Sequence, residues 1–118
     1  YFRSDKIKKL KTKLKCIPIR KNMGWCDDVK CKKFYNKLIS TEKRVRHEKL
    51  YRKDFKYNLL IPLSYNSNPT ILGKGSAIFF HLTKNYKGTE GCIALKEKDL
   101  LILLKLINSK TRILIKKI

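Results

Sequence analysis

The sequence predicts one α+β domain, mostly β with one or two helices, and three stretches support this. Ala77–Phe80 is a compact apolar run bounded by Gly73 and Gly75, which is typical of a buried strand. Asn58–Leu63 is a second short apolar run that reads as a strand. Glu97–Ile107 carries apolar residues at helical spacing, on a face wide enough to be mostly buried.

The composition fits a single small domain. The chain has 118 residues, of which 42% are hydrophobic, enough for one modest core but not for two. It has no run of apolar residues long enough to cross a bilayer, so we expect no membrane span. We expect residues 1–15 to form a basic N-terminal segment and residues 16–118 to form the domain.

The N-terminal segment allows two interpretations. Ile7, Leu10 and Leu14 are spaced like one face of a helix, and a basic amphipathic helix could bind RNA or an anionic surface. The alternative is a solvated arm or loop that leads into the domain. Cys16–Ile19 should be extended, because Pro18 opposes helix at the residue before it.

The stretch Gly24–Asp28, GWCDD, indicates a turn that the Trp25 indole packs on the core. Asp27 and Asp28 could cap a short helix over Lys30–Ile39. As neighbouring carboxylates they could also suggest a metal or acid/base pair, but side chains adjacent in sequence rarely converge on one point.

Residues 41–57 are strongly charged, with aromatic residues interleaved, as in some nucleic-acid-stacking surfaces. No RRM, KH or zinc-finger pattern accompanies them. In the strand that follows, Pro62 fits an edge position.

The C-terminal third begins with Ile93–Leu95, which continues extended into the predicted helix. Glu97 and Asp99 lie in the first helical turn, where the helix dipole favours acidic groups. Asn108 and Ser109 end the helix, and Arg112–Ile115 is expected to form a closing strand.

One histidine and one cysteine suggest a catalytic pair. His81 ends the predicted strand, and Cys92 follows Gly91, whose backbone freedom permits a tight turn that presents the thiol. A cysteine nucleophile needs a base or cation nearby, and imidazole is the usual one. The structural alternative is a buried free cysteine beside a histidine that is only a satisfied polar group.

The other three cysteines are Cys16, Cys26 and Cys31. The spacing of the last two is close to that of zinc ligands, and His47 or His81 could complete a site, although the paired Cys-x2-Cys of a zinc ribbon is absent. In an exported protein, one disulfide could form among these three and leave Cys92 free.

Three stretches resemble the L,D-transpeptidase catalytic domain (YkuD-like), in a divergent branch: GWCDD, GKGSAIFFH at residues 73–81 and TEGC at residues 89–92. The resemblance covers most of residues 24–107. It departs from the family at Glu90, where a histidine is usual, at Ala94, where an arginine is usual, and in a short His-to-Cys interval. It implies a β-sandwich catalytic domain that is N-terminally incomplete, with the chain starting after the first strands.

The resemblance also implies a chemistry. Cys92 would be the nucleophile and His81 its base, with the imidazole oriented by a backbone carbonyl near Gly91 or Glu90 and the oxyanion held by the amides at Gly91–Cys92. The implied partners are peptidoglycan stem peptides of the bacterial cell wall, in the periplasm or cell envelope. No metal or organic cofactor is required. The expected substrate-binding residues are Trp25, Ser76, Thr89 and Glu90.

The charge supports a different class of function. Thirty Lys and Arg against nine Asp and Glu give a net charge of +21, which attracts nucleic acid, anionic lipid or acidic wall polymers. A basic nucleic-acid-binding protein without catalysis is therefore an alternative. A catalytically inactive relic of the transpeptidase family is another.

Overall fold

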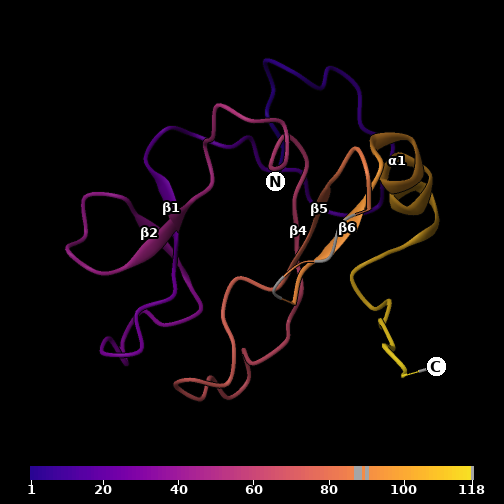
Figure 1. Ribbon diagram of the computed structural model, residues 1–118. Helices are drawn as coiled ribbons and strands as arrows, with labels where there is room; N and C mark the ends of the chain where they lie inside the picture. The colour runs from indigo at the N-terminus through magenta and orange to yellow at the C-terminus, as the bar shows by residue number, and fades with distance from the viewer. Residues whose placement is uncertain (87–88, 90, 118) are drawn as a thin grey trace.

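The computed structural model describes residues 1–86, 89 and 91–117. It confirms the predicted fold class: the chain is mostly β, and a single helix occurs among the described residues. The elements in chain order are β1 (Met23–Cys26), β2 (Leu38–Ser40), β3 (His47–Lys49), β4 (Ile61–Pro62), β5 (Phe79–Leu82), β6 (Ile93–Leu95) and α1 (Glu97–Leu106). In Figure 1 the β1–β2 region, the β4–β5–β6 sheet and α1 lie side by side in that order.

The first sheet has the order β2-β1-β3, and both strand pairs are antiparallel. Gly24 allows its strands to approach closely, because a Cβ there would lie 2.9 Å from Cδ2 of His47. His47 Nδ1 lies 2.8 Å from the Val45 carbonyl oxygen. His47 therefore serves the packing of this sheet.

The second sheet has the order β4-β5-β6 and mixes two kinds of pairing. β4 and β5 are antiparallel, whereas β5 and β6 are parallel, with His81 opposite Ala94. Parallel neighbours usually need a long crossover connection, yet only residues 83–92 join these two. The short connection places the end of the loop directly beside the strand that carries His81.

The N-terminus extends this second sheet. Phe2 bridges Leu59 in antiparallel sense and Pro18 in parallel sense, and the Arg3 amide donates to the Asn58 carbonyl at 2.8 Å. Ile7 is buried in the core beneath α1. Residues 1–15 therefore form no helix, and they contribute both backbone pairing and core contacts. A boundary after residue 15 stays a prediction.

Two clusters of buried side chains cover opposite faces of the β4–β5–β6 sheet, because successive strand residues point to opposite sides. On the helix side, Phe80 and Leu82 pack with Leu100 and Leu104. On the other side, Phe79 packs in a second cluster with residues from the rest of the chain: Ile19, Leu50, Tyr57, Leu60 and Ala77. Trp25 of β1 and Cys92 are partly buried against that second cluster.

The predicted C-terminal helix is confirmed with nearly the predicted bounds. Glu97 and Asp99 occupy its first turn and Lys105 its last, as the helix dipole favours. Leu100 and Leu104 are its buried residues.

The helix predicted over Lys30–Ile39 is wrong. Residues 29–37 form turns, and Leu38–Ser40 is strand β2, paired with β1. Asn36 adopts a left-handed φ of 57°, which ends any helical run and which asparagine tolerates better than most residues. Long-range pairing overrides the local tendency here.

The other strand boundaries also differ from prediction. Arg112–Ile115 forms no strand and is exposed, so that prediction is wrong. Only Ile61–Pro62 of the predicted Asn58–Leu63 strand pairs with β5, and it does so at the sheet edge expected from Pro62. β5 begins two residues later than expected, because Ala77 has a left-handed φ of 58°.

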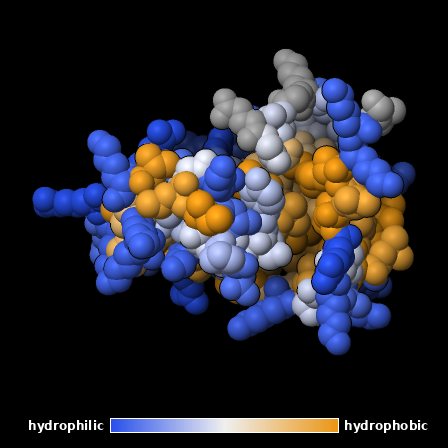
Figure 2. Space-filling view, turned by 90° about the horizontal axis from the view of Figure 1, so that it is seen from below, coloured by the Kyte–Doolittle hydropathy of each residue, from blue (hydrophilic) through white to orange (hydrophobic). Residues whose placement is uncertain are grey.

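The surface combines basic and aliphatic side chains. Figure 2 shows hydrophobic residues gathered around a hollow, with hydrophilic side chains projecting at its rim. In the C-terminal segment, Leu114 and Ile115 are exposed aliphatic residues. Within the described part of the chain, no helix has the length and apolar character needed to span a bilayer.

Candidate active site

The parallel pairing of β5 and β6 brings His81 and Cys92 together. Phe80 pairs with Ile93, so Phe79 lies opposite Cys92, and His81 stands two residues further along the same face. From ordinary strand spacing and rise, such diagonal neighbours have Cα atoms about 8 Å apart. An imidazole and a thiol side chain can meet across that separation. Both residues therefore belong to the sheet face that turns away from α1.

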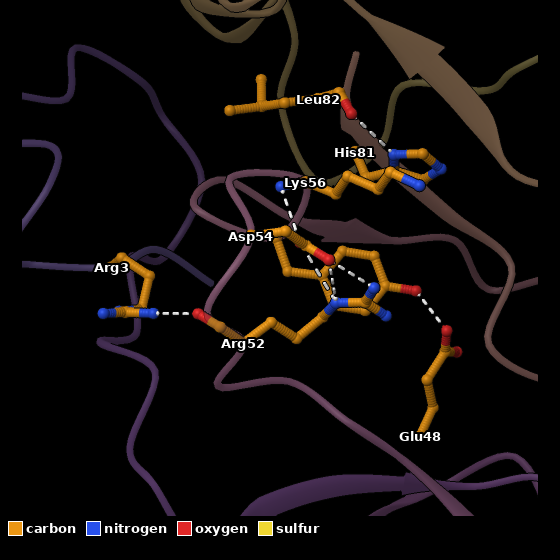
Figure 3. Close-up of polar contacts among 8 residues, drawn as sticks. Arg3, Glu48, Arg52, Asp54, Lys56, His81 and Leu82 are labelled. Atoms are coloured by element: carbon orange, nitrogen blue, oxygen red, sulfur yellow. Dashed lines mark hydrogen bonds and ion pairs between the residues drawn. The ribbon is translucent and has the colours of Figure 1, made fainter. Parts of the chain in front are cut away.

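His81 is held in a defined orientation. Its side chain is buried, with the residue only 9% exposed, and Nδ1 lies 3.0 Å from the Leu82 carbonyl oxygen (Figure 3). Because a carbonyl can only accept, Nδ1 carries the proton in this contact and Nε2 keeps its lone pair. The orienting carbonyl is thus that of Leu82, within β5, and not that of Gly91 proposed from sequence. Glu90 lies outside the described residues.

Cys92 is a half-buried thiol at the start of β6. Its Sγ donates to the Ala77 carbonyl at 3.2 Å. Burial raises the pKa of this thiol, the backbone amide of Phe79 partly opposes that effect, and the Glu48 carboxylate adds to it. The resting side chain is therefore a thiol at neutral pH, and it needs a base to become a nucleophile.

All four cysteines are free thiols, so the disulfide considered among Cys16, Cys26 and Cys31 is absent. Cys26 is buried, and burial raises the pKa of its thiol. Among the residues that the structure describes, no three His, Cys, Asp or Glu side chains are placed to hold a metal ion.

Two residues next to the pair were not assigned a role from sequence. The Tyr57 ring meets the His81 ring edge-on, with centroids 5.7 Å apart, and the Tyr57 hydroxyl donates to Glu48 Oε1 at 2.5 Å. In Figure 3 a dashed line marks the hydrogen bond that joins Glu48 to this hydroxyl. Sequence patterns carry only a weak signal for Glu48 and Tyr57, because the contact between them depends on how β3 packs near β5.

The turn before Cys92 has the backbone freedom that the sequence predicted. Gly91 has a φ of 111°, a region that residues with a Cβ rarely adopt. A Cβ added to Gly91 would also lie 3.2 Å from Cδ1 of Ile78. Thr89, an expected substrate contact, is exposed, and its hydroxyl donates to the Cys92 carbonyl, so it braces the turn.

Trp25 and Ser76, also expected to bind substrate, lie where the two sheets meet. Trp25 is edge-on to Phe79 at 5.3 Å and donates from Nε1 to Asn36 Oδ1 at 2.9 Å. Ser76 donates to the Cys26 carbonyl at 2.6 Å. In the structure both side chains hold the wall of the site together, and their contact with substrate stays a prediction.

Asn36 links these pieces. Its Oδ1 accepts from the Trp25 indole and from the Ala77 amide at 3.2 Å, while Nδ2 donates to the carbonyls of Tyr65 and Asn66. The side chain is buried and fully hydrogen-bonded. It therefore fixes the backbone of Ala77, whose carbonyl receives the Cys92 thiol.

The two aspartates of the GWCDD stretch act separately. Asp28 accepts from the Lys30 and Arg46 amides at 2.9 and 3.1 Å, which lowers the pKa of its carboxyl. Asp27 Oδ1 is buried without a hydrogen-bond partner among the described residues and lies 3.5 Å from Arg46 Nε. Asp28 thus caps a turn and not the helix that was predicted.

Two cavities lie along β4, with volumes of about 290 and 640 Å³. The smaller is lined by N-terminal residues and by Leu59–Pro62, and the larger by β4 and the segment after α1. Cys92 and His81 are absent from the described residues that line them. The geometry of the pair, and not cavity size, therefore locates the candidate site.

Comparison with known proteins bears on the family and the fold of this chain. A profile of the L,D-transpeptidase catalytic domain (YkuD) matches residues 11–115. Searches of curated proteins and of solved structures give no significant match. The profile covers most of the 118 residues, and the structure has the mostly β fold that the resemblance implied. The chain belongs to the L,D-transpeptidase catalytic-domain family.

Proposed function

We propose that this protein is a cysteine acyltransferase of the L,D-transpeptidase type, acting on peptidoglycan stem peptides in the periplasm or cell envelope. The observation that carries the proposal is the placement of His81 and Cys92 on one face of adjacent parallel strands, with His81 Nδ1 engaged by the Leu82 carbonyl. That arrangement leaves Nε2 as the basic nitrogen for a thiol.

The reaction begins with attack of Cys92 Sγ on the carbonyl carbon of the third stem residue. The thiol proton passes to His81 Nε2, and the amides at the Gly91–Cys92 turn stabilise the oxyanion. The tetrahedral intermediate collapses by breaking the amide bond to the terminal D-amino acid, whose nitrogen takes the proton from the imidazolium. A thioester on Cys92 and a free D-amino acid result.

The second half of the reaction releases the enzyme. An acceptor amine attacks the thioester and loses a proton to His81, and the thiolate leaves and is reprotonated. With water as acceptor the same steps give a carboxypeptidase. Trp25, Ser76, Thr89 and Glu90 are the proposed substrate contacts in both reactions, and no metal or organic cofactor takes part.

Intact-mass spectrometry tests the first half directly. The reduced protein is mixed with a tetrapeptide-stem muropeptide, with Cys92→Ala as the control. We expect an adduct equal to the stem minus its terminal residue, absent from the control. A wild-type protein that is folded by circular dichroism and forms no adduct would indicate an inactive relic.

The net charge of +21 supports a second, non-catalytic property, attraction to polyanions. Binding to RNA that weakens steeply with salt, in a protein that forms no acyl adduct, would favour the nucleic-acid-binding alternative.

A further inference from the structure

Tyr57 stands between a carboxylate and the histidine of the candidate pair. Its hydroxyl donates to Glu48 of β3 at 2.5 Å, and its ring meets the His81 ring at 5.7 Å with an interplanar angle of 62°. The same ring is edge-on to Phe79 at 5.9 Å. Tyr57 is buried, at 5% exposure, so these contacts are not loosened by solvent.

An arginine also contacts the Tyr57 ring. The Arg52 guanidinium lies 4.9 Å from the centre of the Tyr57 ring and pairs with Asp54 at 2.6 Å. Arg3 donates to the Arg52 carbonyl at 2.7 Å, which ties this turn to the N-terminal segment (Figure 3). The ring therefore has few alternative positions.

We propose that Glu48 and Tyr57 are positioning residues for the His81–Cys92 pair: the carboxylate fixes the hydroxyl, and the fixed ring limits rotation of the imidazole. This inference rests on the proposed function for the step that it serves. The Leu82 carbonyl fixes one ring nitrogen of His81, but a single hydrogen bond still permits tilting of the ring. The Tyr57 edge restricts that tilt, so that Nε2 keeps its direction.

The pair also sets the charge around Cys92. The titratable groups that face the thiol come from three places: Glu48 on β3, Tyr57 before β4 and His81 on β5. Burial and the Glu48 hydrogen bond raise the pKa of Tyr57 far above its ordinary range, so it stays a neutral phenol. Glu48 then supplies the negative charge that disfavours a resting thiolate at Cys92. The Cys92 nucleophile therefore forms by transfer of the thiol proton to His81.

A double-mutant cycle on thiol reactivity separates positioning from packing. The rate of Cys92 alkylation by iodoacetamide at pH 7 is followed by peptide mapping in the wild type, Tyr57→Leu, His81→Ala and the double variant. We expect His81→Ala to slow alkylation about a hundredfold, the low end of what a general base contributes. Tyr57→Leu should slow it similarly, with no further loss in the His81→Ala background.

Tyr51→Leu is the matched control. Tyr51 packs against the same cluster and also lies under an arginine, Arg3 at 3.7 Å, but it has no ring contact with His81 among the described residues. It should leave Cys92 alkylation unchanged. Equal slowing by Tyr57→Leu in both His81 backgrounds would overturn the proposal, because it would show a packing effect only.

Conservative variants keep the test decisive if Tyr57→Leu does not fold. Glu48→Gln keeps an acceptor for the Tyr57 hydroxyl and removes the charge, so the alkylation midpoint should move to lower pH. Tyr57→Phe keeps the ring but removes the hydroxyl that Glu48 holds, so it should lose most of the His81-dependent rate. An unmoved midpoint in Glu48→Gln together with an undiminished rate in Tyr57→Phe would contradict the proposed roles. Because alkylation needs no stem peptide, these results stand apart from the acyl-adduct experiment.

Discussion

The two faces of the β4–β5–β6 sheet differ in kind. Toward α1 the face is aliphatic and aromatic, with Phe80 and Leu82 against Leu100 and Leu104. Toward β1 the same strands present His81 and the neighbouring Cys92, with the Tyr57 ring against His81 and the Tyr57 hydroxyl bonded to Glu48. One face is held by burial alone, and the other by burial together with directed hydrogen bonds.

The difference shows how a small domain combines stability with reactivity. Strand alternation lets residues adjacent in sequence serve opposite purposes, so Phe80 packs under the helix while His81 faces the chemistry. The polar face keeps its groups satisfied through Asn36 and the Leu82 carbonyl, which limits the cost of burying them. Changes on the two faces should therefore have different consequences.

Leu100→Ala should cause the largest loss of stability and the smallest change in chemistry. Leu100 is completely buried on the helix face, and its truncation leaves a cavity that costs about 2–5 kcal/mol in the free energy of unfolding. Urea denaturation measures the loss. Cys92 alkylation of the folded fraction should keep its pH dependence. A shift in that dependence would mean that the two faces are coupled.

Asn36→Ala should damage the site face. It leaves the Trp25 indole and the Ala77 amide without their acceptor, at roughly 1–3 kcal/mol for each buried group left unpaired. It should also slow Cys92 acylation, because the Ala77 carbonyl would lose its fixed position. Asn36→Asp retains the acceptor but loses the donor to the Tyr65 and Asn66 carbonyls, so it should also be less stable while keeping the hydrogen bond to the Ala77 amide. Denaturation and acyl-adduct rates measured together check this, and unchanged acylation in a destabilised Asn36→Ala would count against it.

Gly91→Ala should have a moderate effect that is concentrated on catalysis. At a φ of 111° an alanine is strained by about 1–3 kcal/mol, and its Cβ would press on Ile78. Gly73→Ala is the matched control, since Gly73 has a φ of 77° and open space around its Cβ position. Only Gly91→Ala should slow acyl transfer. Equal slowing in both variants would remove the special role of this turn.

The smallest expected effect is a loss of stability in alkali. Burial raises the pKa of the Cys92 and Cys26 thiols, so the folded state binds protons that the unfolded chain releases first. The stabilisation of the folded state by these two thiols is fully present below the ordinary thiol pKa of about 8.5, and it is lost as the pH rises above that value. Thermal melts between neutral and alkaline pH should show Tm falling. A Tm that rises with pH over this range would contradict the assignment of these thiols as buried.

The sequence allowed much of the second sheet and its helix to be predicted, because their signals are local. The glycine-bounded apolar run and the leucine spacing of α1 depend on neighbouring residues only. The region around Asn36 was mispredicted, since Leu38–Ser40 acquires its strand character from pairing with β1. Such pairing has no signature in a single short segment.

The candidate site was likewise predictable only in part. His81 and Cys92 could be chosen from residue type, position and resemblance, but the parallel register that aligns them could not. Glu48 and Tyr57 come from a strand and a turn whose approach to β5 depends on the whole fold. The role of the Leu82 carbonyl in orienting His81 could not be predicted either, because it depends on the path of the backbone at β5.

The most direct test of the account is release of the terminal D-amino acid from a tetrapeptide-stem muropeptide. Wild type is compared with Cys92→Ala, His81→Ala and Cys16→Ala, the last removing an exposed thiol outside the site. We predict release by wild type and Cys16→Ala, and loss of release in Cys92→Ala and His81→Ala. Release that persists in Cys92→Ala, or no release from folded wild type, would contradict the claim that this sheet face performs acyl transfer.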